Sequence, residues 1–300
     1  MIPDGLVVID KPAGLTSQQV VNRAKHRLAD QAGVPAKRLK AGHAGTLDPM
    51  ATGVLVVGVG RATRLLGYVA GHDKQYLATI RLGQATTTDD AEGEPVGQPV
   101  DATGLTPSAI EAAIAPLTGD IEQVPSSVSA IKVDGKRAYA LARAGEAVTL
   151  RSRPVTVSRF EVLTRHDDGP FVDMDVVVEC STGTYVRALA RDLGAGLGVG
   201  GHLTALRRTR VGVFDVGTAA ALDDLTLKDV RPLSGLAGLF PTLTLAPADV
   251  ADVAFGRPLK LVVPADPTAV VSPGGGFLAL YRPDGDHSTP AVVFVQGVKL

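Results

Sequence analysis

The chain has 300 residues, of which 45% are hydrophobic and 20% are charged, and its formal net charge is −1. This composition predicts a globular protein of about two domains and excludes a disordered tail or a small disulfide-stabilised domain. The single cysteine, Cys180, excludes an intramolecular disulfide, and no two histidines have metal-ligand spacing, so we expect no zinc or iron site. An acidic N-terminus and short apolar runs predict neither a signal peptide nor a membrane span, and hence a cytosolic protein.

Charged residues are segregated along the chain. Lys and Arg dominate Arg23–His43, with six against one acid, and Lys132–Arg165, with eight against three, while Arg207–Arg210 adds three arginines without an acid. Gln84–Glu122 is the reverse, with eight acids and no Lys or Arg. This pattern fits a polyanion-binding face backed by an acidic one, because each phosphate contact needs a cation. Ordinary solvated helix faces account for the same charges, so charge alone leaves both interpretations open.

The first half of the chain alternates strands and helices. A short buried strand is predicted over Gly5–Asp10, and the capping-box spacing of Thr16–Gln19 starts a helix whose apolar residues repeat at helical intervals. Apolar and β-branched runs predict strands over Val54–Val59 and Gln75–Leu82. Thr106, followed by proline, is a favoured cap at the start of a second helix.

The middle of the chain combines a basic excursion with a strong strand signal. Val124–Arg153 is basic and polar, and a short helix is predicted within it over Arg137–Arg143. Apolar residues on one face alternate along Val172–Val178, which predicts a half-buried strand. A helix over Thr184–Leu193 and a strand over Val211–Val216 follow. Because the elements lack the regular unit of a parallel fold, we predict a mixed α+β domain.

The C-terminal part has a different character. Leu225–Ala246 is rich in Leu, Pro and Gly, and beyond it Ala269–Tyr281 and Ala291–Val298 are predicted strands that flank a loop over Arg282–Pro290. We therefore expect a small β-rich module of about fifty residues. From Leu245 onward five acids outnumber four Lys/Arg, a poor balance for strong binding of a polyanion.

One loop concentrates residues suited to chemistry. Gly42–Leu55 holds three glycines, a histidine and Asp48 ahead of an apolar strand. Its glycines permit a tight loop, and Pro49 holds the backbone of Asp48 extended. A carboxylate fixed in this way can act as a nucleophile or a base. An isolated Asp-Pro pair is more often a turn cap, so the case for catalysis depends on the rest of the chain.

Five motifs occur in one order along the chain: Asp10–Ser17 (DKPAGLTS), Gly42–Leu55 (GHAGTLDPMATGVL), Val124–Lys132 (VPSSVSAIK), Ser181–Gly194 (STGTYVRALARDLG) and His202–Arg208 (HLTALRR). Together they resemble the TruB family of tRNA pseudouridine synthases over nearly all of the first 215 residues. The resemblance implies an enzyme that isomerises uridine 55 in the T-loop of tRNA to pseudouridine and needs no metal or organic cofactor.

The resemblance also implies a fold and a division of the chain. We expect a catalytic domain over residues 1–240, with the mixed, largely antiparallel sheet of the pseudouridine synthase fold and an RNA-gripping insertion at about residues 124–153. A PUA-like RNA-binding domain is expected over residues 245–300. The implied partner is the T-arm stem-loop of tRNA, bound by a cytoplasmic monomer that needs no membrane and no obligatory protein partner.

Matched position by position, the resemblance implies three catalytic residues. Asp48 is the catalytic aspartate, Tyr76 stacks on the uracil ring, and Arg187 pairs with the Asp48 carboxylate. His43 is implied to help displace the loop of the RNA and hold the flipped nucleotide, and Tyr185 and Leu206 to line the same pocket as Tyr76. The other residues expected to bind substrate lie on the insertion: Lys132, Lys136, Arg137, Arg143, Arg151 and Arg153. Lys11 and Pro12 are implied to support the site structurally.

Elementary chemistry agrees with these roles. A uridine must leave its stack before its C1′ and C5 atoms can be reached, and an aromatic platform such as Tyr76 would contribute about 1–3 kcal/mol of stacking. A desolvated pocket favours the neutral form of a carboxylic acid, so Asp48 requires a cation beside it, and the fork of Arg187 suits both carboxylate oxygens. Three roles stay open for Asp48: addition to the sugar, addition to the ring, or action as a base on the sugar.

Three other functions compete with this interpretation. Gly58-Val-Gly60 after a strand is a weak sign of a dinucleotide enzyme, but Thr63 stands where a third glycine is needed. A non-catalytic RNA chaperone would bind tRNA without forming product. A sister synthase acting on rRNA, or working with guide RNA and partner proteins, is disfavoured by the compact C-terminus and the absence of long tails.

Overall fold

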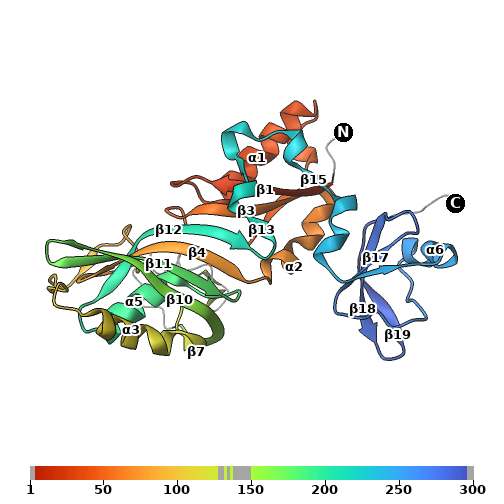
Figure 1. The fold of residues 1–300 in the computed structure, drawn as a ribbon. Helices are drawn as coiled ribbons and strands as arrows, with labels where there is room; N and C mark the ends of the chain where they lie inside the picture. Colours follow the sequence, from red (N-terminus) through yellow and green to blue (C-terminus); the bar gives the residue numbers. More distant parts are fainter. Residues whose placement is uncertain (1–3, 128–131, 134–135, 138–149, 296–300) are drawn as a thin grey trace.

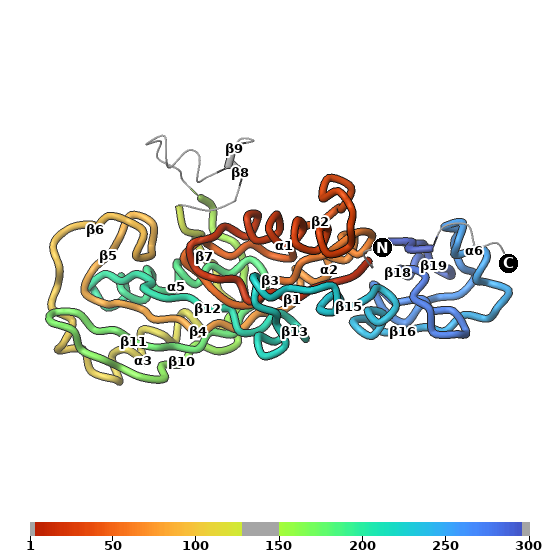
Figure 2. The backbone as a smooth tube through the Cα atoms, turned by 90° about the horizontal axis from the view of Figure 1, so that it is seen from above, coloured from red at the N-terminus to blue at the C-terminus, as the bar shows by residue number. Residues whose placement is uncertain are grey.

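The computed structural model describes residues 4–127, 132–133, 136–137 and 150–295. These residues form a large sheet covered by helices and a smaller sheet at the C-terminal end (Figures 1 and 2). In the described ranges, eleven strands make up the large sheet, in the order β14-β1-β3-β12-β4-β11-β10-β7, with β13, β15 and β2 paired to β12, β1 and β3. The bounds of these strands are β1 Gly5–Lys11, β2 Ala41–Ala44, β3 Thr52–Val59, β4 Lys74–Leu82, β7 Gly119–Gln123, β10 Arg153–Asp168, β11 Phe171–Cys180, β12 Gly201–Val211, β13 Phe214–Asp215, β14 Ala220–Ala221 and β15 Arg231–Pro232.

The sheet is mixed and largely antiparallel, which confirms the predicted fold class. Only the β1–β14 and β3–β12 pairs are parallel among its described neighbours. Four short strands pair outside it: β5 Ala85–Thr86 with β6 Pro95–Val96, and β8 Lys132–Val133 with β9 Lys136–Arg137.

The α-helices lie on both sides of the large sheet and in the C-terminal module. Their bounds are α1 Ser17–Gln31, α2 Leu66–Ala70, α3 Pro107–Ile114, α5 Val186–Gly196 and α6 Val250–Ala254. Short 3₁₀ segments cover Ala36–Arg38, Gly60–Leu65, Ala115–Leu117, Val216–Thr218, Leu222–Asp224, Leu227–Asp229, Leu233–Gly235, Ala237–Leu239 and Pro247–Asp249. None of the described helices combines the length and the apolar character needed to cross a membrane.

Two helix starts form as the sequence predicts. The Thr16 side chain accepts from the Gln19 backbone, and the Gln19 side chain accepts in return from the Thr16 backbone, which completes the capping box of α1. At the start of α3 the Thr106 side chain accepts from the Ala109 N–H, and proline occupies the first turn. These local bonds satisfy backbone N–H groups that have no partner within the helix.

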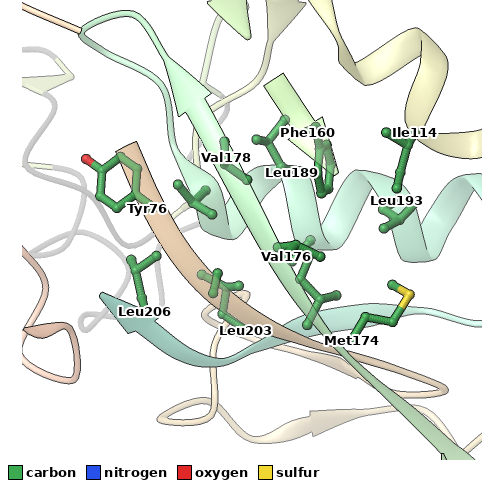
Figure 3. Packing of buried hydrophobic residues seen from close by; sticks show 14 of the residues in the cluster. Tyr76, Ile114, Phe160, Met174, Val176, Val178, Leu189, Leu193, Leu203 and Leu206 are labelled. Atoms are coloured by element: carbon green, nitrogen blue, oxygen red, sulfur yellow. The ribbon is translucent and has the colours of Figure 1, made fainter. Parts of the chain in front are cut away.

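Hydrophobic burial places the helices on the sheet. Residues on one face of β4 and β11, including Ile80 and Met174, pack with α3 and α5 in one buried cluster, and Figure 3 shows Ile114, Leu189 and Leu193 meeting them. β1 and β3 are buried on both faces, because α1 covers one side and α2 with neighbouring segments covers the other. β1 therefore has a continuous apolar run rather than an alternating one.

The two halves of the sheet meet where β3 runs beside β12. Gly53 lies opposite Arg208 in this parallel pair, with a φ of +99°. A Cβ atom at Gly53 would lie 2.1 Å from the carbonyl oxygen of Arg208. Only glycine fits this junction, for both conformational and steric reasons.

Several predicted elements differ from the structure. The strand expected over Val211–Val216 is instead the end of β12, a turn at Gly212 with a φ of 51°, and the short β13. The expected helix over Arg137–Arg143 is wrong at its first residue, since Arg137 belongs to β9, and its remainder lies outside the described residues. Helix α5 begins at Val186 rather than Thr184. The long strands β10 and β12 were not predicted, because charged and polar residues interrupt their apolar pattern.

The C-terminal module is a four-stranded sheet in the order β16-β17-β18-β19. Its strands are β16 Thr242–Thr244, β17 Thr268–Val271, β18 Phe277–Asp284 and β19 His287–Val293. The single strand expected over Ala269–Tyr281 is two strands separated by a turn, and the loop expected over Arg282–Pro290 is mostly a hairpin of paired strands. The β-rich character of this part is confirmed.

An aromatic contact joins the module to the large sheet. Tyr68 on α2 packs edge-on against Phe240, with ring centroids 5.8 Å apart, and Phe240 continues to Phe277 and Phe294. Arg64 donates to the Val293 carbonyl at 2.7 Å. One buried apolar cluster therefore runs from β1 and β3 into the second sheet.

Ile80 tests the packing between β4 and the helices. We expect Ile80→Ala to lower the free energy of unfolding by about 2–5 kcal/mol, because Ile80 is fully buried and the cavity would fill only partly. Leu77→Ala on the same strand is the control, since Leu77 is 42% exposed, and it should cost less than about 1 kcal/mol. Urea unfolding of both variants makes the comparison, and equal losses would contradict the proposed burial.

Candidate active site

The loop between β2 and β3 carries Asp48, and the buried Lys11 side chain binds its backbone. The Lys11 ammonium donates to the carbonyl groups of Pro12 at 2.9 Å, Pro49 at 3.1 Å and Ala51 at 2.6 Å. Burial lowers the pKa of Lys11 to about 8, although the nearby Asp48 charge acts in the opposite direction. Lys11 thus ties the end of β1 to the part of the loop that follows Asp48.

Ser17 and Arg208 hold the same loop from two further elements. The Ser17 hydroxyl donates to the Leu47 carbonyl at 3.0 Å and accepts from the Leu47 N–H at 2.8 Å. Arg208 on β12 donates to the carbonyls of Val54 at 2.8 Å and Gly45 at 3.2 Å. The loop is therefore fixed through its backbone.

Asp48 and Arg187 form a two-pronged ion pair. Arg187 Nε lies 3.0 Å from Asp48 Oδ2, and Arg187 Nη2 lies 3.2 Å from Asp48 Oδ1. The Asp48 side chain is 34% exposed whereas that of Arg187 is 3% exposed. The pair thus presents a carboxylate to the solvent-accessible side and keeps its cation inside.

The buried side of Arg187 has further partners that the sequence did not reveal. Its Nη1 donates to the Thr88 carbonyl at 2.8 Å and to the Ser126 hydroxyl at 2.9 Å, and its Nε lies 3.5 Å from Asp90 Oδ2. Asp90 is itself buried and accepts from the Glu92 N–H. The two carboxylates offset part of the free energy that is needed to remove the arginine's charge from water. Asp90 belongs to the acidic segment Gln84–Glu122, which the sequence indicated as an outer face. The only available signal for Asp90 was that a buried arginine needs a carboxylate beside it.

A pocket of about 250 Å³ opens beside the ion pair. It is lined by five of the predicted site residues, Asp48, Tyr76, Tyr185, Arg187 and Leu206. In Figure 3 Tyr76 and Leu206 lie side by side at one end of the buried cluster. Burial raises the pKa of the Tyr76 hydroxyl, so it stays neutral at physiological pH. The pocket combines two aromatic rings, aliphatic side chains, one carboxylate and three cationic side chains.

Tyr185 is the residue that precedes the first turn of α5, and Gln123 holds its backbone in position. Its N–H donates to the Gln123 side chain at 2.8 Å, and Gln123 donates back to the Tyr185 carbonyl at 3.1 Å. The end of β7 thereby fixes the first turn of the helix that carries Arg187.

His43 lies on β2, next to the loop but not among the residues that line the pocket. Its Nδ1 atom is buried and has no hydrogen-bond partner among the described residues. Burial, followed by the charge of Arg208, lowers the pKa of His43. His43 is therefore a neutral side chain beside the loop.

Lys74 is a pocket residue that the sequence did not single out. Its ammonium donates to the carbonyls of Ala70 at 2.9 Å and His72 at 2.7 Å, and it lines the pocket beside Tyr76. Burial lowers the pKa of Lys74 to about 8, and Arg208 acts in the same direction. Its position two residues before Tyr76, on the same buried face of β4, was the available signal.

The arginines of Arg207–Arg210 do not form the free basic surface that their sequence indicated. Arg207 pairs with Asp10, with its Nη2 at 2.7 Å from Oδ2, and Arg210 lies 3.2 Å from Glu179. Arg208 is buried under the loop. Their partners come from β1, β3 and β11, which no local inspection of the sequence reveals.

The basic insertion is described only in part. Lys132 on β8 pairs with Arg137 on β9 in a short hairpin that also contains Lys136. Arg151 and Arg153 are exposed where the chain enters β10. Arg143 lies outside the described residues, as do the side chains of the hairpin.

Family models cover most of the chain. Residues 34–186 match the TruB family pseudouridylate synthase N-terminal domain, residues 187–231 match a tRNA pseudouridylate synthase B C-terminal domain, and residues 240–295 match a tRNA pseudouridine synthase II C-terminal domain. The chain belongs to the TruB family of pseudouridine synthases. It is thus an RNA-modifying isomerase.

Similar proteins agree with this family. The chain is 54% identical over 290 residues to tRNA pseudouridine synthase B of Cutibacterium acnes, covering 95% of each protein, and 53% identical over 298 residues to the protein of the same name from Thermobifida fusca, covering 97% and 98%. A chain of an H/ACA RNP bound to a substrate RNA containing 2′-deoxyuridine has a TM-score of 0.69 at 24% identity, over 98% of this chain and 86% of its own. That likeness shows the pseudouridine synthase fold.

The hold of Lys11 on the loop is open to a direct test. We expect Lys11→Met to lower the free energy of unfolding by about 1–3 kcal/mol, because three carbonyl groups lose a buried donor. Lys37→Met, at an exposed lysine, is the control and should change stability by less than about 0.5 kcal/mol. A Lys11 variant as stable as the control would show that the carbonyls find other donors.

Proposed function

We propose that this TruB-family enzyme isomerises uridine 55 in the T-loop of tRNA to pseudouridine. The observation that carries the proposal is the bidentate Asp48–Arg187 pair at a pocket walled by Tyr76 and Leu206. Relatives named tRNA pseudouridine synthase B, about half identical over nearly the full length, support tRNA as the substrate.

The geometry supports a flipped base as the reacting species. A pocket of about 250 Å³ accepts one pyrimidine, and Tyr76 and Leu206 supply apolar surfaces for its ring. In the reaction the N1–C1′ bond breaks, the uracil turns within the pocket, and C5 bonds to C1′. C5 then loses its proton and N1 gains one, so the product is an isomer of the substrate. Asp48 supplies the carboxylate for the glycosidic step, and Arg187 orients that carboxylate through two N–H groups.

The remaining residues divide between support and RNA binding. Lys11 and Pro12 hold the loop, His43 lies beside it, and Tyr185 closes the pocket at the start of α5. Lys132, Lys136, Arg137, Arg143, Arg151 and Arg153 contact phosphates of the T-arm. The catalytic domain extends over residues 1–240 and a PUA-like domain over residues 245–300. The enzyme acts as a cytoplasmic monomer, without a cofactor or a protein partner.

Asp48→Asn tests the chemistry. We expect no detectable pseudouridine in an unmodified T-arm stem-loop with this variant, while wild type turns over without added metal or cofactor, because the amide lacks the required charge. The matched control is Asp10→Asn, since Asp10 is also 34% exposed and gripped by an arginine, but lies outside the pocket. It should keep activity within about threefold of wild type.

Two outcomes would overturn the assignment. RNA binding without product from wild type indicates a chaperone or a synthase of another RNA. Product from Asp48→Asn at the wild-type rate removes Asp48 from the mechanism.

The salt dependence of binding tests the insertion. Replacing its six basic residues with Ala should weaken tRNA binding and flatten the plot of log affinity against log salt, by about 0.7–0.9 per lost phosphate contact. Arg159→Ala with Arg165→Ala is the control, because these arginines are already paired with Glu161 and Asp167. An unchanged slope in the six-residue variant would place the RNA elsewhere.

A further inference from the structure

Helix α5 carries a second arginine, Arg191, one turn after Arg187. Residues four apart lie on the same helix face, so both guanidinium groups extend to the same side. Arg187 lines the pocket and contacts Asp48, whereas Arg191 does not line it. Any effect of Arg191 on the pocket must therefore pass through the residues that it contacts.

The two arginines bridge the same pair of chain segments. Arg187 donates to the Thr88 carbonyl at 2.8 Å and to the Ser126 hydroxyl at 2.9 Å. Arg191 lies 3.3 Å from Asp89 Oδ2 and donates to the Val124 carbonyl at 2.7 Å. Each arginine thus contacts both the turn at residues 86–90 and the segment at residues 123–127.

Asp89 adopts an unusual conformation for this contact. Its φ is 62°, the only positive value among the non-glycine residues described. Its backbone carbonyl accepts from the Leu203 N–H at 3.1 Å, which anchors the turn to β12. Burial raises the pKa of Asp89, while the Arg191 charge acts in the opposite direction. Both the positive φ of the Asp89 backbone and the burial of its carboxylate cost free energy, so surrounding contacts must stabilise them. Arg191 supplies one of these contacts.

We propose that Arg191 and Asp89 are positioning residues that set the Thr88 carbonyl and the Ser126 hydroxyl against Arg187, and so hold Arg187 at Asp48. Thr88 directly precedes Asp89, and Ser126 follows Val124 by two residues, so the Arg191 contacts fix the backbone on both sides of the Arg187 Nη1. A displacement of either acceptor would draw the guanidinium away from its bidentate alignment with the carboxylate.

Arg191→Met tests this role because it keeps the aliphatic stem and removes every donor. We expect kcat on an unmodified T-arm stem-loop to fall about tenfold to a hundredfold, with KM changed by less than about twofold, because the pair touches no substrate. Asp89→Asn should act in the same direction, since Asn tolerates a positive φ. The double variant should be little worse than either single variant, as expected for two partners of one interaction.

Asp192→Asn is the matched control. Asp192 also contacts Arg191, with its Oδ1 2.8 Å from Nε, but it lies on the same helix, and among the described residues no hydrogen bond joins it to either bridged segment. Its kcat should stay near the wild-type value, and Arg191→Lys should recover part of the loss by restoring one charged contact. Circular dichroism of each variant reports whether it is folded, and Asp89→Asn tests the same pair should Arg191→Met not fold.

A second readout separates this inference from the proposed function on which it rests. Hydrogen exchange of the Arg187 Nε–H, followed by NMR without RNA and assigned through Arg187→Lys, should become faster in Arg191→Met. If wild type forms no pseudouridine in the T-arm RNA, the proposed function fails. The exchange rate of the Arg187 Nε–H still tests whether Arg191 and Asp89 position Arg187. An unchanged kcat with unchanged exchange, or a rise in KM alone, would overturn the positioning role.

Discussion

The arrangement of the site depends on the burial of one cation. Arg187 is 3% exposed, so the cost of removing its charge from water must be offset by oriented partners. Asp48 and Asp90 supply negative charge, and Thr88 and Ser126 supply hydrogen-bond acceptors. These partners come from three separate segments of the chain. One arrangement of the loop, the turn at residues 86–90 and the segment at residues 123–127 around α5 satisfies the guanidinium. The pocket lies between the loop, the start of α5 and the strands β4 and β12.

The large sheet makes this convergence possible because its central strands are buried and closely spaced. β3 approaches β12 at Gly53, and the same register places Arg208 under the Asp48 loop. Lys11 and Arg208 grip the loop by its carbonyl groups rather than by its side chains. The backbone is thus fixed without using the Asp48 carboxylate, which stays available for Arg187.

Local sequence features predicted the parts of the fold that have local causes. The capping box at Thr16 and the alternation along Val172–Val178 each have a physical origin within a few residues, and both elements formed. The strand β12 escaped prediction because its arginines are satisfied by distant carboxylates and carbonyls. Asp90 was missed for the same reason, since its partner Arg187 is far away in the chain. The family resemblance supplied Asp48, Tyr76 and Arg187, whereas the contacts of Lys74 and Ser126 became visible only in three dimensions.

The unequal exposure of the ion pair bears on competition among anions. Arginine binds phosphate with the same two-pronged geometry that it uses for carboxylate, and a substrate RNA offers a phosphate at every nucleotide. An open guanidinium in this place would exchange Asp48 for the RNA backbone and hold the substrate in an unproductive position. The Arg187 side chain lines the pocket but is only 3% exposed, so a phosphate that enters the pocket has little access to it while Asp48 is in place. The burial of the arginine therefore favours its own carboxylate partner over the many anions of an RNA chain.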